Sequence, residues 1–553
     1  MKAILSLMSI ALLQTAGHTQ NCQWANSLGS ADNSTRIEQV RSYPWDRVLV
    51  CGTFAAPSLV LGDHTLTNSG QDDGFVALAD ENGDYQWATR IGGANHDIVT
   101  DMATHTSGDL VAVGNFRSVF LPIDDTTLSN TGESDVFMAK FNADYSLAWV
   151  RRIGGSEIDE ATCVRIDGSG NIHVSGQMIN KFTLQTIHLF IRKYAPNGDL
   201  LWERTGIVEN GAAYSSALAL DDEQNIYLSG WMYGTVTFDN ATLVSDLDYA
   251  AYVVKHDPDG TLLTTTMSYD HGDFTAIEIR GNHIYASARK VSFGIGWGWP
   301  LGDSKVYVMK FDEDLNTIWS RDFGGETQNQ SLDRAESLSV DAEGNAYVAG
   351  SFFSDTLFFA GDTLLNPYNA PYYYPQIFVA KYSPAGDEML AVSAGGMHID
   401  EATSIHVVGS DKFFLAGNFE SDPAEFGTQE LNNTSQLDSF YVHLYPARYG
   451  RKPMGFLAKF EAETSTDIDE RDDQGFALWP NPTNSSIAIR VDPSMRSAVT
   501  VEVLRLDGRV VHQVTQRSSG SVMQLDINDL APGPYMLSVI SEEFRSTQRF
   551  IKH

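Results

Sequence analysis

The chain contains little cysteine, little proline and few basic residues. Its 553 residues include 3 Cys and 18 Pro, and 37 basic residues stand against 71 acidic ones, for a formal net charge of −34. So few cysteines exclude a disulfide-rich scaffold. A charge this negative repels phosphate backbones, so no nucleic-acid partner is expected. Cys22, Cys51 and Cys163 lie in apolar, strand-like runs, and we expect buried thiols; a disulfide between two of them is the alternative.

Long apolar runs are also absent, except near the first residue. Lys2 precedes the apolar run Ala3–Leu13, and the small or polar residues Thr15, Ala16 and Gly17 follow it. This order is typical of a secretory signal peptide, which we assign to residues 1–20. No later run reaches the roughly 18 apolar residues of a membrane span. The sequence therefore predicts an exported protein without a membrane span.

The usual catalytic motifs are missing as well. The sequence has no Gly-x-Ser-x-Gly, His-Glu-x-x-His, Walker phosphate loop or Cys-x-x-Cys. Asp97, Asp159 and Asp400 each stand four residues after the second glycine of a Gly-Gly pair. Repetition in register favours a structural task, the acceptance of turn amides, over catalysis or metal binding. No catalytic residue, metal ligand or cofactor is predicted, although acidic loops leave calcium binding possible.

What the sequence does contain is an internal repeat. "IVTDMATHTSGDLVAVGNF" from Ile98, "ATCVRIDGSGNIHVSGQM" from Ala161 and "AESLSVDAEGNAYVAGSF" from Ala335 share one pattern. Each unit has four short strands, here named a to d, and is punctuated by Gly-Asn, Asn-Gly or Asp-Gly turns that suit tight hairpins. Four-stranded units at a spacing of about 61 residues indicate the blades of a β-propeller, with strand a nearest the axis.

Seven a strands can be counted, but the seventh unit lacks a d strand. Its c strand is expected at Gly455–Phe460, and an acidic stretch follows. The orphan "NCQWANSLGS" (Asn21–Ser30) matches the d strand "DYQWATRIGG" (Asp84–Gly93) and has no c strand before it. We therefore expect Gln23–Leu28 to pair with Gly455–Phe460 and to close an all-β, seven-bladed propeller over residues 21–463. The d strands carry Trp87, Trp149, Trp202 and Trp319, whereas Thr264 and Leu390 stand where two further tryptophans would be.

These units resemble the bacterial β-propeller repeats often called SBBP repeats. The resemblance covers roughly Asn21–Glu463 and rests on phrases such as "IFVAKYSPAGD" and "GNAYVAG". It implies the propeller fold and little about activity, because propellers are scaffolds for unrelated functions.

The end of the chain has a different pattern. Residues 464–474 are acidic and read as a solvated linker, and residues 475–553 show the alternating strands of a small Ig-like β-sandwich. This region is similar to the type A C-terminal sorting domain of the type IX secretion system. The residues that carry the resemblance are Pro480, Asn481, Pro482, Asp507, Gly508, Gly533, Tyr535 and Lys552.

The resemblance implies export across both membranes. Partners would then be the type IX secretion machinery and its sortase, and the protein would be secreted or held at the outer cell surface. Anchoring and release both stay open, and an accessory sandwich without a sorting role is the alternative.

Aromatic residues gather in the b-to-c loops of the last three units. The loops are "GIGWGWPLGD" (Gly294–Asp303), "NPYNAPYYYPQ" (Asn366–Gln376) and "YPARYGRKP" (Tyr445–Pro453). Three neighbouring loops on one face could present rings to a sugar or a peptide. The candidate ligand-binding residues are Trp297, Trp299, Tyr372, Tyr373, Tyr374, Tyr445 and Tyr449. The alternative is that these rings pack on one another as a lid.

The sequence thus favours a secreted, monomeric propeller scaffold that binds extracellular glycan or protein. A secreted hydrolase or lyase that acts on extracellular polymer is the alternative.

Overall fold

The computed structural model describes residues 20–29, 34–43, 47–183, 185–268, 272–290, 305–325, 333–359, 362–367, 374–410, 412–435, 437–441, 448–462, 476–479, 486–491, 498–505, 509–517, 523–531, 533–540 and 545–552. The described residues form strands and connecting turns, and none of them is helical. Within them no helix is long and apolar enough to cross a membrane. The chain divides into two compact units, Met1–Glu463 and Thr464–His553, which are described separately.

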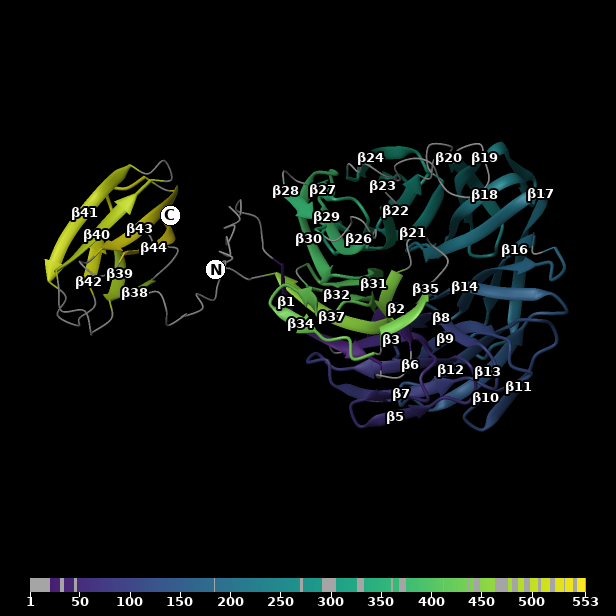
Figure 1. Ribbon diagram of the computed structural model, residues 1–553. Coiled ribbons are helices and arrows are strands. Elements are labelled where there is room, and N and C mark those ends of the chain that lie inside the picture. Colours follow the sequence, from purple (N-terminus) through teal and green to yellow (C-terminus); the bar gives the residue numbers. More distant parts are fainter. Residues whose placement is uncertain are drawn as a thin grey trace. The chain divides into compact units, whose positions relative to one another are not determined.

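The described strands of the larger unit pair in successive sets of four (Figure 1). Unit 1 contains β2 (Thr35–Tyr43), β3 (Arg47–Phe54), β6 (Asp73–Ala79) and β7 (Tyr85–Ile91). Unit 2 contains β8 (Asp97–Thr104), β9 (Leu110–Phe116), β12 (Asp135–Phe141) and β13 (Leu147–Ile153). Unit 3 contains β14 (Ile158–Ile166), β15 (Ile172–Ile179), β16 (Thr186–Tyr194) and the first part of β17 (Leu200–Leu220). Unit 4 contains the rest of β17, β18 (Ile226–Phe238), β19 (Ala241–His256) and β20 (Leu262–Ser268).

The remaining units follow the same order. Unit 5 contains β21 (Asp273–Arg280), β22 (His283–Lys290), β23 (Lys305–Phe311) and β24 (Thr317–Phe323). Unit 6 contains β25 (Arg334–Val340), β26 (Ala346–Phe352), β29 (Gln376–Tyr382) and β30 (Glu388–Gly396). Unit 7 contains β31 (Asp400–Val408), β32 (Lys412–Phe419), β37 (Met454–Ala462) and β1 (Gln20–Leu28). All pairings within the units are antiparallel.

The N-terminal strand completes unit 7, as the split repeat predicts. Trp24 lies opposite Lys459 and Leu28 opposite Gly455, so β1 is the outer partner of β37. In Figure 1 the purple β1 lies beside the light green β37. The predicted pairing of Gln23–Leu28 with Gly455–Phe460 is confirmed.

Units 3 and 4 share one sheet because β17 runs through both of them. Its first part pairs with β16 and its second part with β18. The segment Gly206–Gly211 that joins the two parts lacks a Gly-Gly pair followed by aspartate. At four other junctions this combination ends one strand and precedes the next, but β20 and β1 end without it, so its absence alone does not explain the continuous strand.

The core lies between consecutive units, not inside any one of them. Phe116 and Phe137 of unit 2 pack with Leu49 and Val76 of unit 1 in one such cluster. Clusters of the same kind join each described unit to the next, and one of them packs Phe414 of unit 7 into unit 1. Each sheet is therefore buried on both faces, which explains the continuously apolar b and c strands.

Four b-to-c connections, which the sequence analysis treated as loops, contain small hairpins. They are β4 (Ser58–Leu61) with β5 (His64–Thr67), β10 (Phe120–Ile123) with β11 (Thr126–Ser129), β27 (Thr356–Phe359) with β28 (Asp362–Leu365), and β33 (Ala424–Phe426) with β34 (Gln429–Leu431). An asparagine after each hairpin donates a hydrogen bond to the carbonyl that ends the b strand. The pairs are Asn68 with Phe54 (3.1 Å), Asn130 with Phe116 (2.9 Å), Asn366 with Phe352 (3.4 Å) and Asn433 with Phe419 (3.0 Å). A fifth pair, β35 (Leu437–Tyr441) with β36 (Arg448–Arg451), follows in unit 7.

The smaller unit consists of two sheets over one core. One sheet contains β38 (Phe476–Trp479), β39 (Ser486–Val491) and β42 (Met523–Asp526). The other contains β41 (Val510–Arg517), β40 (Ala498–Leu504), β43 (Gly533–Ile540) and β44 (Arg545–Lys552). Ile487 and Leu525 of the first sheet pack with Val503 and Leu537 of the second.

Three residues of the sorting motif fall within the described part of this unit. Tyr535 is buried and donates a hydrogen bond to the Ala531 carbonyl at 2.9 Å, and Gly533 lies opposite Lys552 in the β43–β44 ladder. Pro480, Asn481, Pro482, Asp507 and Gly508 lie outside the described residues.

Candidate functional site

All of the innermost strands carry a one-residue β-bulge at the same register. The extra residue is Glu38, Thr100, Thr162, Ser216, Thr275, Glu336 or Thr403. A bulge bends its strand and leaves one residue outside the ladder. All four threonines turn their hydroxyls to the neighbouring b strand. Thr100 donates to the carbonyl of Val113, Thr162 to Ser175 and Thr275 to Ser287, each at 3.3 Å, and Thr403 donates to Ala416 at 3.4 Å. The repeated bulge therefore shapes every strand in the same way where they converge.

A cavity of about 360 Å³ lies where these strands meet, and each of the innermost strands contributes to its wall. Three residues beyond the bulge, the wall consists of Arg41, Ala103, Arg165, Ala219, Glu278, Ser339 and His406. These positions lie in the second half of each strand. The cavity is therefore displaced toward the end at which strand a turns into strand b, away from the end that carries the b-to-c connections.

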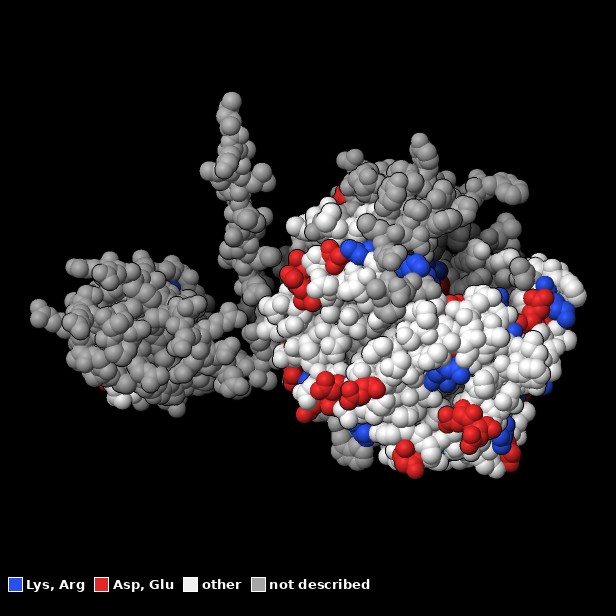
Figure 2. All heavy atoms as spheres, turned by 60° about the horizontal axis from the view of Figure 1, so that its bottom comes forward, with Lys and Arg blue, Asp and Glu red and all other residues white. Residues whose placement is uncertain are grey.

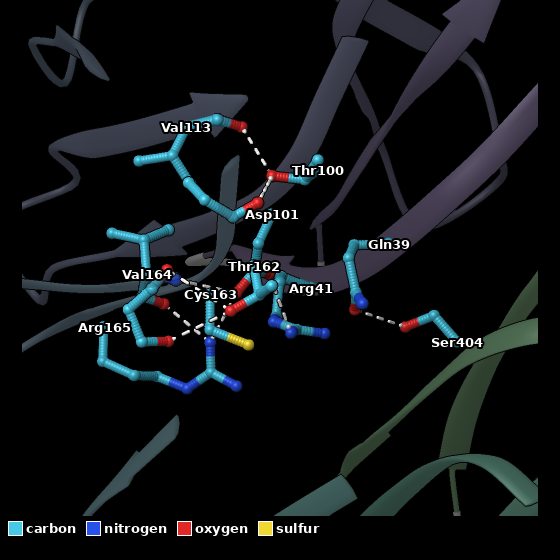
Figure 3. Close-up of polar contacts among 12 residues, drawn as sticks. Gln39, Arg41, Thr100, Asp101, Val113, Thr162, Cys163, Val164, Arg165 and Ser404 are labelled. Atoms are coloured by element: carbon cyan, nitrogen blue, oxygen red, sulfur yellow. Dashed lines mark hydrogen bonds and ion pairs between the residues drawn. The ribbon is translucent and has the colours of Figure 1, made fainter. Parts of the chain in front are cut away.

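Asp101 of β8 holds an arginine from each neighbouring unit (Figure 3). Its Oδ1 accepts from Arg41 at 3.0 Å, and its Oδ2 accepts from Arg165 at 2.7 Å and from the Val164 amide at 3.0 Å. The carboxylate is 1% exposed, whereas the Arg41 and Arg165 side chains are 19% and 27% exposed. One buried carboxylate thus fixes two partly open guanidinium groups at the cavity wall.

His406 and Glu278 complete the charged part of this wall. Burial, together with the positive charges of Arg41, Arg165 and Arg280, lowers the pKa of His406 to about 3. Its ring Nε2 lies 2.8 Å from the Ser42 hydroxyl. Burial raises the pKa of Glu278, an effect that the Val340 amide and the charge of Arg280 partly offset. His406 is therefore neutral at physiological pH.

The first halves of the innermost strands are richer in carboxylates than in arginines. Arg334 of β25 contacts Glu336 at 2.5 Å and Glu401 of β31 at 2.7 Å. Burial raises the pKa of both Glu38 and Glu336, and Arg36 lies beside Glu38. Carboxylates outnumber arginines here. Even so, no group of three His, Cys, Asp or Glu side chains in the described part of the chain could hold a metal ion.

Tryptophans on four of the d strands fix their unit to the next. The indole N–H of Trp149 donates to Pro196 at 3.2 Å, that of Trp202 to Pro258 at 3.3 Å and that of Trp319 to Pro384 at 3.1 Å. Trp24 of β1 does the same to Glu81 of unit 1 at 2.8 Å. In every case the acceptor lies in the c-to-d turn of the following unit. We name this contact the tryptophan clasp.

Glycine in the turn makes room for the clasp. Gly386 has a φ of 83°, and a Cβ built on it would lie 2.8 Å from the Trp319 ring. Tyr145 replaces this glycine in unit 2, and Trp87 instead stacks on the Tyr145 ring at a centroid distance of 5.3 Å. Sequence reasoning found the repeated tryptophans but not their partners, because each partner belongs to the next unit.

The repeated aspartates accept turn amides, as the sequence predicts. The amides of Gly93, Gly155 and Gly396 donate to Asp97, Asp159 and Asp400 at 2.6, 2.8 and 2.7 Å. Asp400 also accepts from the Glu420 and Ser421 amides, both at 3.2 Å, and from the Ser421 hydroxyl at 2.6 Å. Burial raises the pKa of Asp400 to about 7 against the effect of these donors. Asp333 plays the same part for Gly325 at a spacing of eight residues, which hid it in the sequence.

The cysteines are free and buried, as expected, and no disulfide joins them. Burial raises the pKa of the Cys163 thiol to about 11 and that of Cys22 to about 12. The Cys163 sulfur lies beside Arg165 at the cavity wall (Figure 3). A thiol with so high a pKa is protonated at neutral pH and is a poor nucleophile.

The aromatic candidates are largely outside the described residues. Trp297, Trp299, Tyr372, Tyr373 and Tyr445 belong to undescribed segments, and Tyr449 lies in β36 without a described side chain. Tyr374 is 7% exposed, and its ring meets that of His398 at a centroid distance of 5.2 Å. Tyr374 therefore packs inward and presents no open ring face.

The acidic surplus is not gathered in one place on the face that Figure 2 shows. Acidic and basic side chains occur there in small separate groups with uncharged surface between them. This face therefore carries no large patch of a single sign.

Residues 477–553 match the family model described as "Secretion system C-terminal sorting domain". This tail is a type IX sorting domain. The protein is therefore secreted through the type IX system, whose machinery recognises the tail, and it is located at the outer cell surface. The SBBP-like character of the larger unit rests on the repeat pattern alone.

Similarity outside the sorting tail is distant. An uncharacterized WD repeat-containing protein of Acanthamoeba polyphaga mimivirus is 22% identical over 194 residues, which is 28% of this chain and 14% of that protein. Sqt1 from Chaetomium thermophilum is 8% identical with a TM-score of 0.38, over 81% of this chain and 99% of that one. The phage phi92 endosialidase is 10% identical with a TM-score of 0.36, over 96% and 87% of the two chains. At these values the likeness identifies neither a family nor an activity.

Proposed function

We propose that the protein is an extracellular binding protein whose axial cavity receives a small ligand or one end of a larger one. Residues 21–463 would form a closed, seven-bladed propeller, residues 464–474 an acidic linker and residues 475–553 an Ig-like sorting domain, after removal of residues 1–20. The observation that carries the proposal is the cavity of about 360 Å³, which combines arginine, glutamate and hydroxyl side chains. A pocket of this size and polarity suits a polar organic molecule.

The wall chemistry favours binding over catalysis. Its thiol is protonated, its histidine has a pKa of about 3, and the described residues offer no metal-binding group. No nucleophile or base near neutrality is therefore available from these groups. The proposal needs no cofactor.

A cavity-filling variant tests the proposal. Ala219→Phe places a large ring in the cavity, whereas Ala148→Phe makes the same change on the exposed side of β13. The exported protein is probed on an array of extracellular glycans and peptides. We expect Ala219→Phe to abolish the binding that wild type and Ala148→Phe retain. Equal binding by all three proteins would contradict an axial site.

The aromatic candidates Trp297, Trp299, Tyr372, Tyr373, Tyr374, Tyr445 and Tyr449 are proposed as a second contact surface at the opposite end. The support is their position in neighbouring b-to-c connections, and the buried ring of Tyr374 weakens the case for that residue. Trp297→Ala with Trp299→Ala should weaken array binding by about 1–3 kcal/mol while leaving Tm unchanged. A fall in Tm without a change in binding would favour the lid.

A polymer hydrolase or lyase is the second candidate. The observation in its favour is that Glu278 and Glu336, two carboxyls whose pKa burial raises, line the same cavity. Retaining and inverting glycosidases both require such a pair. Release of reducing ends from a bound glycan, lost in Glu336→Gln, would establish this reading in place of simple binding.

A further inference from the structure

The two arginines of the axial cavity, Arg41 and Arg165, indicate a more specific ligand. We infer that Arg41 and Arg165 form a carboxylate-binding site for a hydroxylated organic acid, such as a uronic acid unit of an acidic glycan. The inference rests on the proposed function, because it names the class of ligand for the same cavity.

The first step is the balance between arginines and carboxylates near Asp101. Among the described residues, Asp101 is the carboxylate in contact with both Arg41 and Arg165, at 3.0 and 2.7 Å, and it is shielded from solvent. Glu278 on the opposite wall is already engaged by the Val340 amide and the neighbouring Arg280. With Arg280, the two cavity arginines are the three positive charges that act on His406, so this part of the cavity is a positive environment.

The second step is that the remaining carboxylates of this region have arginine neighbours of their own. Glu38 and Glu336 lie at the level of the bulges, beside Arg36 and Arg334, although Glu336 also lines the cavity. His406 lies among Arg41, Arg165 and Arg280 and stays neutral, as a ring in a positive environment does. This local environment favours an anion beside Arg41 and Arg165.

The third step is geometry. Arg41 and Arg165 come from β2 and β14, and Ala103 of β8 stands between them at the same register of the wall. A methyl group at that position leaves space in front of the two guanidinium groups. Guanidinium donors match the two oxygens of a carboxylate, and two of them held by a buried anchor are preorganised for it.

The fourth step is the rest of the wall, which selects the class of acid. Ser216, Thr275, Ser337 and Ser339 also line the cavity. The hydroxyls of Ser216 and Thr275 bond to Asp273 and Ser287, whereas the Ser337 and Ser339 oxygens accept from the Ile405 and Val407 amides and so keep an O–H that can donate. The cavity volume of about 360 Å³ corresponds to roughly a dozen water molecules, which is ample for one sugar ring. Hydroxyl groups at the wall suit a polyol, and the arginines suit its carboxylate.

A charge-matched pair of variants tests this positive environment without any ligand. Ala103→Glu brings a carboxylate to the position between Arg41 and Arg165, and Ala103→Gln brings a side chain of the same shape without charge. We expect the Tm of Ala103→Glu to exceed that of Ala103→Gln by about 2 °C or more at low ionic strength, and 0.5 M NaCl to shrink the difference. A lower Tm for the glutamate variant would refute the positive environment and with it the inference.

Binding is then measured by calorimetry on the exported protein with D-galacturonate and with D-galactose, which differ in the carboxylate. We expect wild type and Ala103→Gln to bind galacturonate at least tenfold more tightly than galactose. Ala103→Glu and Arg165→Gln should lose that preference. Arg117→Gln, which removes an exposed arginine outside the cavity, should keep it.

The outcomes separate the inference from the proposed function. Equal affinity for the two sugars, with binding lost in Ala219→Phe, would refute the carboxylate site and leave the axial binding site standing. Binding of either sugar that Ala219→Phe does not change would refute the axial site itself. A preference for galacturonate that survives Arg165→Gln and Ala103→Glu would place the acid elsewhere and would also overturn the inference.

Discussion

The junction between units 5 and 6 and the junction between units 6 and 7 follow one plan, but the second lacks a part. Trp319 donates to Pro384 in the c-to-d turn of unit 6. Leu390 holds the matching position in unit 6, yet strands c and d of unit 7 come from opposite ends of the ring, β37 and β1. An indole at position 390 would find no such turn. The tryptophan thus occurs only where the next unit offers a c-to-d turn. It is absent before unit 7, where β1 pairs with β37; we call this β1–β37 pairing the seam.

The junction between units 4 and 5 differs in a related way. Thr264 replaces the tryptophan, and Leu315 replaces the turn glycine with a φ of 65°. Leu315 is 6% exposed and packs in the cluster between these units. The room that glycine leaves for an indole elsewhere is filled here by the turn's own side chain. At these two junctions both partners of the clasp change together, whereas between units 1 and 2 Trp87 is kept and only the turn residue changes, to Tyr145.

Removal of β1 should have the largest effect, because it breaks the seam itself. Deletion of Gln20–Leu28 removes the ladder to β37 and the Trp24 clasp, and it uncovers apolar residues on both sides. We expect loss of the cooperative thermal transition and self-association through the free β37 edge. Calorimetry and light scattering check both. A synthetic Gln20–Leu28 peptide should restore the transition, and a deletion variant that melts like wild type would show that the seam is not needed.

Truncation of the clasp should have the next largest effect and should depend on the junction. Trp319 is 7% exposed, so Trp319→Ala removes a buried ring and is expected to destabilise by about 3–5 kcal/mol. Leu390 is half-buried and makes no clasp, so Leu390→Ala should cost about 1–2 kcal/mol. Urea unfolding measures both values. Equal losses would break the comparison between the two junctions.

The stability contributed by the hydrogen bonds to Asp400 in unit 7 should depend on pH. Asn at position 400 would turn an N–H toward the Gly396 amide and the Ser421 hydroxyl, and we expect Asp400→Asn to cost about 2–4 kcal/mol. Because the folded pKa of Asp400 is raised to about 7, its stabilisation is complete below about pH 4 and is lost as the pH rises through 7.

The free-energy gap between wild type and Asp400→Asn should therefore be wider at pH 5 than at pH 8. Denaturant unfolding of both proteins at the two pH values checks this sign. Asp97→Asn is a matched comparison in unit 2, where Gly93 and Ser118 make the same contacts. A gap that widens with pH would mean that the donors outweigh burial.

Restoring the clasp between units 4 and 5 should have the smallest effect. Thr264→Trp with Leu315→Gly recreates the pair found at Trp319 and Gly386, and we expect a gain of about 1 kcal/mol, the scale of one hydrogen bond and its ring contact. Either change alone should destabilise, since one overfills the space and the other empties it. Double-mutant-cycle analysis of urea unfolding gives the coupling, and additive single effects would argue against paired replacement.

The sequence predicted those features that repeat within a unit. The four-strand pattern, the pairing of Gln23–Leu28 and the amide contacts of Asp97, Asp159 and Asp400 could all be read from turn chemistry and register. The hairpins after the b strands were missed because their strands are only three or four residues long. The continuous β17 was missed for a different reason: the absence of a Gly-Gly turn is a weaker signal than its presence.

The candidate site could not be found in the same way. Arg41, Asp101 and Arg165 come from three units and meet only when the strands converge. An alignment of the a strands at the bulge does contain a signal, since Thr100, Thr162, Thr275 and Thr403 share one column and Arg41, Arg165, Glu278 and His406 another. Without the bulge register, these columns are displaced by one residue and the side chains fall on the wrong face.

The pairing of β1 with β37 also orders events in time. Strand β1 has its partner more than 400 residues later, just before the sorting tail. Closing so long a loop is slow, and it cannot begin until β37 has been made. A truncated or stalled chain therefore stays open at its edge, exposed to proteases and chaperones. Unit 7 is therefore complete only after both β1 and β37 have been made.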